Sequence, residues 1–242
     1  EKESLRISLD GRLSRLPHPL ALGSALTHGS ITTDYSEALL EFITPPNKDI
    51  EACLHTLSDI HSFVYQNIGD EILWSTSMPC IVDGEENIPI AQYGCSNVAK
   101  MKTIYRRGLG FRYGRTMQAI AGIHYNFSLP KHFWEMQWGK SAKKEHLQDY
   151  ISNKYLGLIR NFQRHSWLLI YLFGASPAVC SSFLDSIEHH SLEPFDTKQR
   201  SFYRPFATAL RMGSLGYSSV AQHSMNVSYN SLGRYINILK RS

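Results

Sequence analysis

Hydrophobic and polar residues alternate along all or part of three stretches of the chain, and this period of two predicts three strands. The stretches cover residues 1–9, 31–44 and 117–129, and the third has the longest apolar face. Because successive side chains of a strand point to opposite faces, each stretch offers one face to a core and one to solvent or a ligand. We expect the first stretch to turn at Asp10-Gly11.

Apolar residues recur at helical spacing in three further stretches. They predict helices over residues 50–64, 144–165 and 232–239. Asn47 or Asp49 is a suitable N-cap for the first helix, because the side-chain oxygen of such a residue can accept a free backbone N–H. The sequence therefore indicates a protein that contains both helices and strands.

Three stretches lack a clear period. Residues 98–115 mix basic and aromatic side chains, a combination found on nucleic-acid surfaces but more often on solvated helices. A net charge of +4 is too low to favour nucleic acid, so we expect a helix there. Residues 68–97 should form a long ordered loop, and the apolar run 167–173 should be buried.

Three acidic residues lie inside the apolar stretch 31–44, namely Asp34, Glu37 and Glu41. On a regular strand, Glu37 and Glu41 would share one face. Two unpaired carboxylates there would repel each other, and one would have to stay protonated. A divalent cation such as Mg²⁺ would remove this difficulty, because it takes carboxylate oxygens as ligands. An edge strand with its acids in water remains the alternative.

The polar face of the stretch 117–129 carries a second group of candidates. Its members are Gln118, His124, Asn126 and Ser128, with the small residue Gly122 between them. A glycine at this place leaves room for a ligand. A single histidine in a strand is either a satisfied packing residue or a ligand, and its polar neighbours make the second interpretation equally reasonable here.

Composition excludes several classes of protein. The 242 residues are 43% hydrophobic and 19% charged, which is sufficient for a substantial core, and no linker or repeat divides them. We therefore expect one domain over residues 1–242. No membrane-spanning run or secretory signal is visible. The four scattered cysteines form no zinc or disulfide pattern, so we expect reduced thiols in the cytoplasm, with neither membrane nor nucleic acid as a partner.

Seven motifs along the chain resemble one family, the proteobacterial type of glutamate–cysteine ligase, also called γ-glutamylcysteine synthetase. They are Glu1-Lys-Glu-Ser-Leu-Arg6, Gly23-Ser-Ala-Leu-Thr-His28, Ile31-Thr-Thr-Asp-Tyr-Ser-Glu-Ala-Leu-Leu-Glu-Phe-Ile-Thr-Pro45, Ser77-Met-Pro-Cys80, Ala91-Gln-Tyr-Gly94, Gly122-Ile-His-Tyr-Asn-Phe-Ser-Leu-Pro130 and Tyr171-Leu-Phe-Gly-Ala-Ser-Pro177. The resemblance covers the N-terminal portion of a family member, so we expect this chain to be part of a longer protein.

The resemblance implies an activity and a fold. Members of this family use ATP and Mg²⁺ to join the γ-carboxylate of glutamate to the amine of cysteine through a γ-glutamyl phosphate, the first step of glutathione biosynthesis. Their α+β catalytic fold is similar to that of glutamine synthetase, with a curved, mostly antiparallel sheet that lines a funnel and helices outside. We expect an incomplete version of this fold here. The oligomeric state stays open.

The resemblance also implies site residues. Glu3, Asp34 and Glu41 match ligands of one Mg²⁺, and Glu1 and His124 match ligands of a second. The family pattern uses Asp34 rather than Glu37, which places Asp34 just before the regular strand. The matching substrate positions are Tyr35, Tyr105 and Tyr217 around cysteine, Leu109, Gln118 and Arg211 around glutamate, and Asn126 and Ser128 at ATP. Arg211 is the catalytic candidate, since it can stabilise the charge of a phosphoryl group in transfer.

Two alternatives remain at this point. The chain could be a catalytically silent module that binds glutamate or a nucleotide. It could also belong to a related carboxylate–amine ligase that uses another amine. The metal-ligand residues discriminate against the first, and the residues around Tyr35, Tyr105 and Tyr217 bear on the second.

Overall fold

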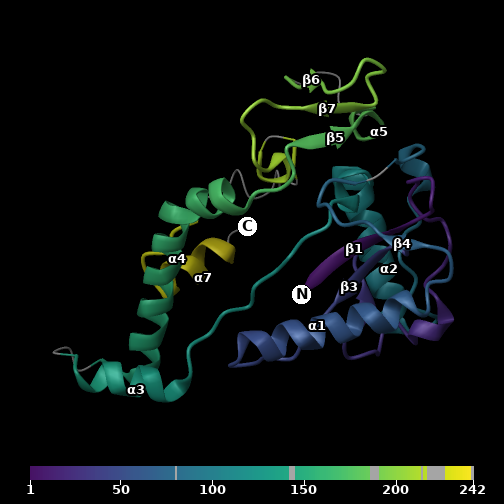
Figure 1. Cartoon of the computed structure of the whole chain (residues 1–242). Coiled ribbons are helices and arrows are strands. Elements are labelled where there is room, and N and C mark those ends of the chain that lie inside the picture. Colours follow the sequence, from purple (N-terminus) through teal and green to yellow (C-terminus); the bar gives the residue numbers. More distant parts are fainter. Residues whose placement is uncertain (80, 142–144, 186–190, 214, 217–226, 241–242) are drawn as a thin grey trace. The chain divides into compact units, whose positions relative to one another are not determined.

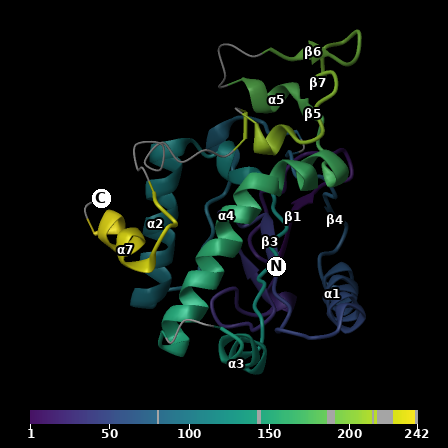
Figure 2. The same cartoon turned by 90° about the vertical axis from the view of Figure 1, so that its left-hand side faces the viewer.

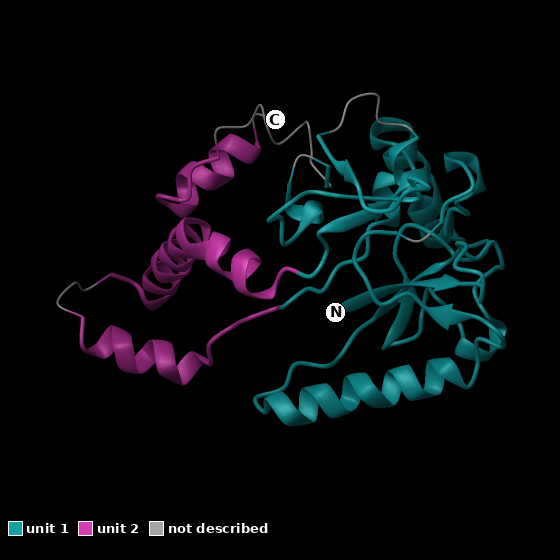
Figure 3. Ribbon diagram, turned by 45° about the horizontal axis from the view of Figure 1, so that its top comes forward, with its two compact units in different colours: residues 1–125, 175–217 teal, residues 126–174, 218–242 magenta. Residues whose placement is uncertain are grey.

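The computed structural model describes residues 1–79, 81–141, 145–185, 191–213, 215–216 and 227–240 (Figure 1). Two compact units make up the chain (Figure 3). Unit 1 consists of Glu1–Tyr125 and Ala175–Tyr217, and unit 2 consists of Asn126–Gly174 and Ser218–Ser242.

A four-stranded antiparallel sheet is the centre of unit 1. Its strands are β1 (Lys2–Ile7), β2 (Ile31–Thr33), β3 (Leu39–Phe42) and β4 (Ile72–Leu73), in the order β2-β3-β1-β4. Neighbouring strands pair antiparallel throughout. The two central strands are almost fully buried, so their alternate side chains contribute to packing on both faces of the sheet.

Helix α1 (Ile50–Tyr65) packs on one face of this sheet. The side chain of Asp49 accepts a hydrogen bond of 2.9 Å from the backbone N–H of Glu51, so Asp49 is the N-cap. Ile60 and Val64 of the helix pack with Leu40 and Phe42 of β3. This cluster holds the helix against the sheet.

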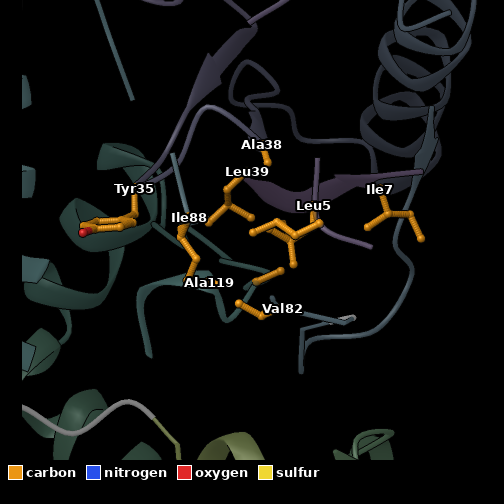
Figure 4. Packing of buried hydrophobic residues seen from close by; sticks show 10 residues of the cluster. Leu5, Ile7, Tyr35, Ala38, Leu39, Val82, Ile88 and Ala119 are labelled. Atoms are coloured by element: carbon orange, nitrogen blue, oxygen red, sulfur yellow. The ribbon is translucent and has the colours of Figure 1, made fainter. Parts of the chain in front are cut away.

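The other face of the sheet covers a second apolar cluster (Figure 4). Leu5 and Ile7 of β1 and Leu39 of β3 pack there with residues from outside the sheet, among them Val82, Ile88 and Ala119. Glu3 and Glu41 lie on the same face as Leu5 and Leu39, because each is two residues away along its strand. The apolar core therefore adjoins the strand positions that carry acids.

Helix α2 (Asn97–Tyr113) has the side chain of Ser96 as its N-cap. Beyond its C-terminus, Glu85 in a short 3-10 helix (Glu85–Asn87) accepts hydrogen bonds from the backbone N–H groups of Arg115 and Thr116. The described residues of unit 1 also form 3-10 helices over Leu20–Leu22, Met117–Ala119 and Leu210–Met212. A small sheet of order β5-β7-β6 completes it, with β5 (Ala178–Cys180), β6 (Glu193–Pro194), β7 (Ser201–Tyr203) and the short helix α5 (Ser181–Leu184).

Unit 2 is helical, with α3 (Lys131–Gly139), the long helix α4 (Leu147–Phe173) and α7 (Leu232–Leu239) (Figure 2). Trp134 of α3 packs on Tyr155 of α4, with ring centroids 5.0 Å apart. Among the described residues, no helix is both long and apolar enough to span a membrane.

The mixed α+β class with antiparallel sheets is as predicted, but three predicted elements differ from the structure. Residues 31–44 form two strands, β2 and β3, with a turn between them, rather than one strand. Residues 117–129 form a 3-10 turn and an extended segment with one bridge, between Ile123 and Lys2, rather than a strand. Residues 167–173 are the last turns of α4, and most of their large apolar side chains are exposed rather than buried.

Candidate active site

Two glutamates face each other across the central strands of the sheet in unit 1. Glu3 of β1 pairs directly with Glu41 of β3 in the antiparallel register. Side chains opposite each other in such a pair lie close together on one face, and like charges there repel. Both glutamates are partly buried, so water screens this repulsion only in part.

Burial, followed by neighbouring carboxylates, raises the pKa values of both glutamates. Burial, followed by the charges of Asp34, Glu3 and Glu1, raises the pKa of Glu41 from 4.5 to about 6. Burial is also the first cause that raises the pKa of Glu3, and the charge of Asp34 is the second. The negative charges of this region therefore destabilise one another in the absence of a cation.

Asp34 lies in the turn between β2 and β3, just before the regular strand, as the sequence motif implied. Its backbone N–H donates to the carbonyl of Leu39 at 3.0 Å, which closes the turn. We refer to Glu3, Asp34 and Glu41 as the carboxylate cluster. Each of its three side chains is partly exposed.

Glu1 and His124 form a pair at the edge of the carboxylate cluster. The Glu1 Oε2 atom lies 3.3 Å from the His124 Nδ1 atom, and the backbone N–H of His124 donates to the Glu1 carbonyl at 2.9 Å. His124 is near enough to lower the pKa of both Glu3 and Glu41 against the dominant effect of burial. The extended segment after residue 119 therefore brings His124 to the sheet.

Two hydrogen bonds of Gly122 join the extended segment after residue 119 to strand β1. The backbone N–H of Gly122 donates to the Glu3 carboxylate at 2.5 Å, and its carbonyl accepts from the Glu3 N–H at 2.9 Å. A Cβ atom at Gly122 would lie 2.9 Å from Arg211 Nη2 and 3.0 Å from His124 Nε2. The absence of a side chain at Gly122 therefore allows Arg211 and His124 to approach the same place.

Arg211 brings a positive charge to this group from the 3-10 helix Leu210–Met212. Its guanidinium donates to the carbonyl of Ala121 and, at 3.3 Å, to the Ser77 hydroxyl. Its charge favours the ionised form of Glu3. No acidic side chain forms an ion pair with Arg211 in the described part of the chain, so the guanidinium has capacity for an anionic ligand.

The carboxylates of Glu3, Asp34 and Glu41 suit a hard divalent cation, because such a cation takes oxygen ligands and would offset their mutual repulsion. Within the described residues, however, no three histidine, cysteine or acidic side chains lie close enough together to hold a metal ion as they stand. The raised pKa of Glu41 is the observation that supports the fit, since a bound cation would offset the repulsion that contributes to it.

Among the candidate substrate positions, Tyr35 and Gln118 are buried and Tyr105 is 63% exposed on α2. The Tyr35 hydroxyl and the Gln118 amide nitrogen have no hydrogen-bond partner among the described residues. Leu109 packs against the same apolar cluster as Tyr35. Tyr217 lies outside the described residues.

Asn126 and Ser128, the candidate ATP contacts, are exposed and belong to unit 2. Glu37, which strand alternation put beside Glu41, is instead a buried structural acid. It is 5% exposed, and its carboxylate accepts hydrogen bonds of 2.5 Å from the backbone N–H groups of His18 and Gln92. The turn at residues 34–38 breaks the alternation, and the Glu37 carboxylate is instead held by these two backbone groups.

Two residues near the carboxylate cluster were not candidates from the sequence. Tyr93 and Arg106 both donate hydrogen bonds to the backbone carbonyl of Asp34. Tyr93 belongs to the motif Ala91-Gln-Tyr-Gly94, which was the available signal. Nothing in the spacing of Arg106 distinguishes it from the other basic residues of α2.

The fold and the site together define an α+β protein with a carboxylate-rich centre beside a histidine and an arginine. The chain belongs to the glutamate-cysteine ligase family, whose model matches residues 1–242. This confirms the resemblance seen in the sequence motifs.

Individual relatives agree with the family match. The glutamate–cysteine ligase of Alcanivorax borkumensis is 59% identical over 239 residues, which cover 99% of this chain and 45% of that protein. The enzyme of the same name from Pseudomonas putida is 53% identical over 242 residues, covering 100% of this chain and 46% of the relative. The chain therefore spans about half the length of the curated relatives that it matches.

Solved structures show the same fold. The crystal structure of glutamate–cysteine ligase from Francisella tularensis in complex with AMP matches with a TM-score of 0.88 and 37% identity, over 99% of this chain and 46% of that one. A bifunctional glutathione synthetase from Pasteurella multocida matches with a TM-score of 0.82 and 32% identity, over 99% of this chain and 29% of that one.

Proposed function

We propose that this chain supplies the N-terminal part of the active site of a glutamate–cysteine ligase. The reaction joins the γ-carboxylate of glutamate to the amine of cysteine and uses ATP, as the first step of glutathione biosynthesis. The observation that carries the proposal is the pairing of Glu3 with Glu41 beside Asp34, with His124 and Arg211 at its border. Family membership supports the same conclusion.

In this proposal the carboxylate cluster of Glu3, Asp34 and Glu41 holds one Mg²⁺, and Glu1 with His124 holds a second. Bound Mg²⁺ would neutralise the phosphate charges of ATP and favour in-line transfer. The short distance between Glu1 and His124 supports the second pair. Gly122 contributes by leaving space between His124 and Arg211.

Arg211 would stabilise negative charge during phosphoryl transfer to the γ-carboxylate of glutamate. Its guanidinium is held by the Ala121 carbonyl and Ser77, so it is oriented before a substrate arrives. The cysteine amine then attacks the carbonyl carbon of the γ-glutamyl phosphate, and phosphate leaves with the electrons of the broken C–O bond. Excess protons pass from the amine to solvent.

Glutamate and cysteine would bind beside this centre. We assign Leu109, Gln118 and Arg211 to glutamate, and Tyr35, Tyr105 and Tyr217 to cysteine. The unpartnered amide nitrogen of Gln118 supports the first assignment, and the unpartnered hydroxyl of Tyr35 supports the second. A buried polar atom without a partner costs free energy unless a ligand or water satisfies it.

ATP is the proposed co-substrate, with Asn126 and Ser128 as contacts. The Francisella tularensis relative was solved with AMP, which supports a nucleotide site in this family. We further propose that residues 1–242 belong to one catalytic domain with a curved sheet lining a funnel, completed by the rest of the protein. A cytoplasmic location agrees with the free thiols of Cys53, Cys95 and Cys180.

The experiment is an assay of ADP release by the full-length protein that depends on both glutamate and cysteine. Glu41→Gln and Asp34→Asn should each reduce kcat/KM by about a hundredfold or more, because the cation loses a charged ligand. Asp59→Asn, which changes an exposed acid of α1, is the control and should have little effect. Activity with glutamate and a different amine, but not cysteine, would contradict the proposal, as would the absence of any ligation.

A further inference from the structure

The turn that carries Asp34 is held at its backbone by donors from two other segments. The Tyr93 hydroxyl lies 2.8 Å from the Thr33 carbonyl and 3.1 Å from the Asp34 carbonyl. The Arg106 Nε–H donates to the same Asp34 carbonyl at 2.5 Å. Together with the bond from the Asp34 N–H to Leu39, these contacts fix the peptide groups on both sides of the Asp34 side chain.

Tyr93 and Arg106 also contact each other. The Arg106 guanidinium carbon lies 4.7 Å from the centroid of the Tyr93 ring, and the Lys102 Nζ atom lies 4.9 Å from the same centroid. Both distances are typical of cation–π contacts. Lys102 and Arg106 therefore share one aromatic ring, but only Arg106 also donates to Asp34.

The segment that carries Tyr93 is itself anchored. The N–H of Ala91 donates to the Tyr35 carbonyl at 3.0 Å, and the N–H of Gln92 donates to the buried Glu37 carboxylate. Thr103 of α2 donates to the Ala91 carbonyl at 3.1 Å. The Tyr93 hydroxyl is thus a donor with little freedom to move, and Tyr93 is only 7% exposed.

We propose that Tyr93 and Arg106 are positioning residues, which hold the backbone of Asp34 so that its carboxylate stays beside Glu41 for cation binding. This inference rests on the proposed role of Asp34 as a ligand of a divalent cation. Groups that orient the ligands of a metal contribute to its affinity without touching it.

The charge of Arg106 makes the inference testable. A positive charge near a cation site disfavours cation binding by direct repulsion. Removal of that charge alone would therefore strengthen binding. Loss of the hydrogen bond to Asp34 would weaken binding, because Asp34 would no longer be held in place. The two effects have opposite signs, and Lys102 provides the matched control for charge and ring contact.

The experiment titrates the full-length protein with Mn²⁺, in the absence of substrates, and follows free Mn²⁺ by electron paramagnetic resonance. Mn²⁺ is a suitable probe, since it prefers the oxygen ligands that Mg²⁺ takes. Arg106→Gln should raise the Kd by roughly tenfold, and Tyr93→Phe, which keeps the ring, by roughly threefold. Lys102→Gln should leave the Kd unchanged or lower it by up to about fourfold.

Asp34→Asn sets the largest increase in the Kd for Mn²⁺ that we expect. It also distinguishes the positioning role of Tyr93 and Arg106 from the proposed cation site. If Asp34→Asn weakens Mn²⁺ binding while Arg106→Gln and Tyr93→Phe leave it unchanged, the positioning role is wrong and the cation site stands. If Asp34→Asn leaves binding unchanged, the proposed cation site is wrong, and the positioning role fails with it. An equal increase in Kd for Lys102→Gln and Arg106→Gln would also overturn the positioning role. Thermal melts check that each variant is folded. If Arg106→Gln is not folded, the Kd of Tyr93→Phe tests the positioning role.

Discussion

Glu3 and Glu41 lie directly opposite each other on adjacent antiparallel strands, with both side chains on the face that continues into the apolar core. The two residues are 38 positions apart in the sequence, so only the folding of the chain brings them together. The pairing concentrates negative charge where water has limited access, and the pKa of Glu41 rises to about 6 as a result of burial and neighbouring carboxylates. This relationship has consequences for stability as well as for cation binding.

Glu41→Gln should make the protein more stable in the absence of divalent cations. Above pH 6 the ionised Glu41 carboxylate destabilises the folded state, since its pKa is higher there than in the unfolded chain. We expect the free energy of unfolding at pH 8 in EDTA to rise by about 1 kcal/mol, after allowance for partial exposure. Urea unfolding of the wild type and the variant measures the difference.

Mg²⁺ should reverse this ranking. Saturating Mg²⁺ should stabilise the wild type by mass action and should stabilise Glu41→Gln much less, because a ligand is missing. The assignment of Glu41 as a cation ligand would be contradicted if Glu41→Gln were less stable than the wild type in EDTA and if Mg²⁺ raised its free energy of unfolding as much as that of the wild type.

Gly122→Ala should impair activity more than stability. The new Cβ atom would meet the ends of two flexible side chains, Arg211 Nη2 at 2.9 Å and His124 Nε2 at 3.0 Å, and these can move by a few tenths of an ångström. We expect a change of less than about 1 kcal/mol in stability but a loss of roughly tenfold in kcat/KM, because the displaced groups belong to the site. Gly233→Ala, where nothing lies within 4 Å, is the control for the effect of glycine replacement alone. Equal activity of the two variants would argue against a role for this close approach.

Gly110→Ala should destabilise the protein unless Tyr35 is changed as well. A Cβ at Gly110 would clash with the Tyr35 hydroxyl oxygen, which is buried and has no hydrogen-bond partner among the described residues. The steric cost of about 1–3 kcal/mol outweighs the gain of about 1 kcal/mol expected from alanine in a helix. In a Tyr35→Phe background, the same change should be neutral or stabilising. A double-mutant cycle on the free energy of unfolding measures the coupling, and strict additivity would show that the two residues do not meet.

His18 should make the protein less stable as the pH falls below about 6.5. Burial first, and then the charge of Arg6, lowers the pKa of His18 in the folded state, against the opposite effect of a backbone hydrogen bond with Gly23. A group with a lowered pKa is neutral in the folded state while the unfolded chain takes up the proton, so its contribution to stability is lost as the pH falls from the unfolded pKa towards the folded one. His18→Leu should show a smaller loss of stability than the wild type between pH 7.5 and pH 5.5. Identical losses would show that the pKa of His18 is the same in the folded and unfolded states.

Local patterns predicted α1, α2, α7 and most of α4, whereas α3 and the short helix α5 were not predicted. Asp49, one of the two predicted N-cap residues, caps α1, and the helical spacing of residues 50–64 corresponds to α1, which ends at Tyr65. The basic stretch 98–115 corresponds to α2, which covers Asn97–Tyr113, and Lys100, Arg107 and Arg112 of this helix are exposed. These elements depend on periodicity and capping, which act over a few residues.

Strand predictions failed where tertiary contacts replaced the regular sheet. Apolar and polar residues do alternate in residues 117–129, but the segment forms a single bridge with the sheet, between Ile123 and Lys2. Hydrogen bonds between Gly122 and Glu3 accompany this bridge, and no continuous ladder forms. Glu37 could not be separated from Glu41 by alternation, because a turn at residues 34–38 intervenes. Only the family motif indicated Asp34 rather than Glu37, and no local pattern indicated that Tyr93 and Arg106 would meet Asp34.

The central claim is that the carboxylate cluster of Glu3, Asp34 and Glu41 holds a divalent cation. The most direct measurement is a crystal structure of the full-length protein grown with Mn²⁺, with an anomalous difference map recorded at the manganese absorption edge. The account predicts a peak within about 2.0–2.3 Å of carboxylate oxygens from Glu3, Asp34 and Glu41. Full occupancy by Mn²⁺ at another place, with no peak beside these three residues, would contradict it.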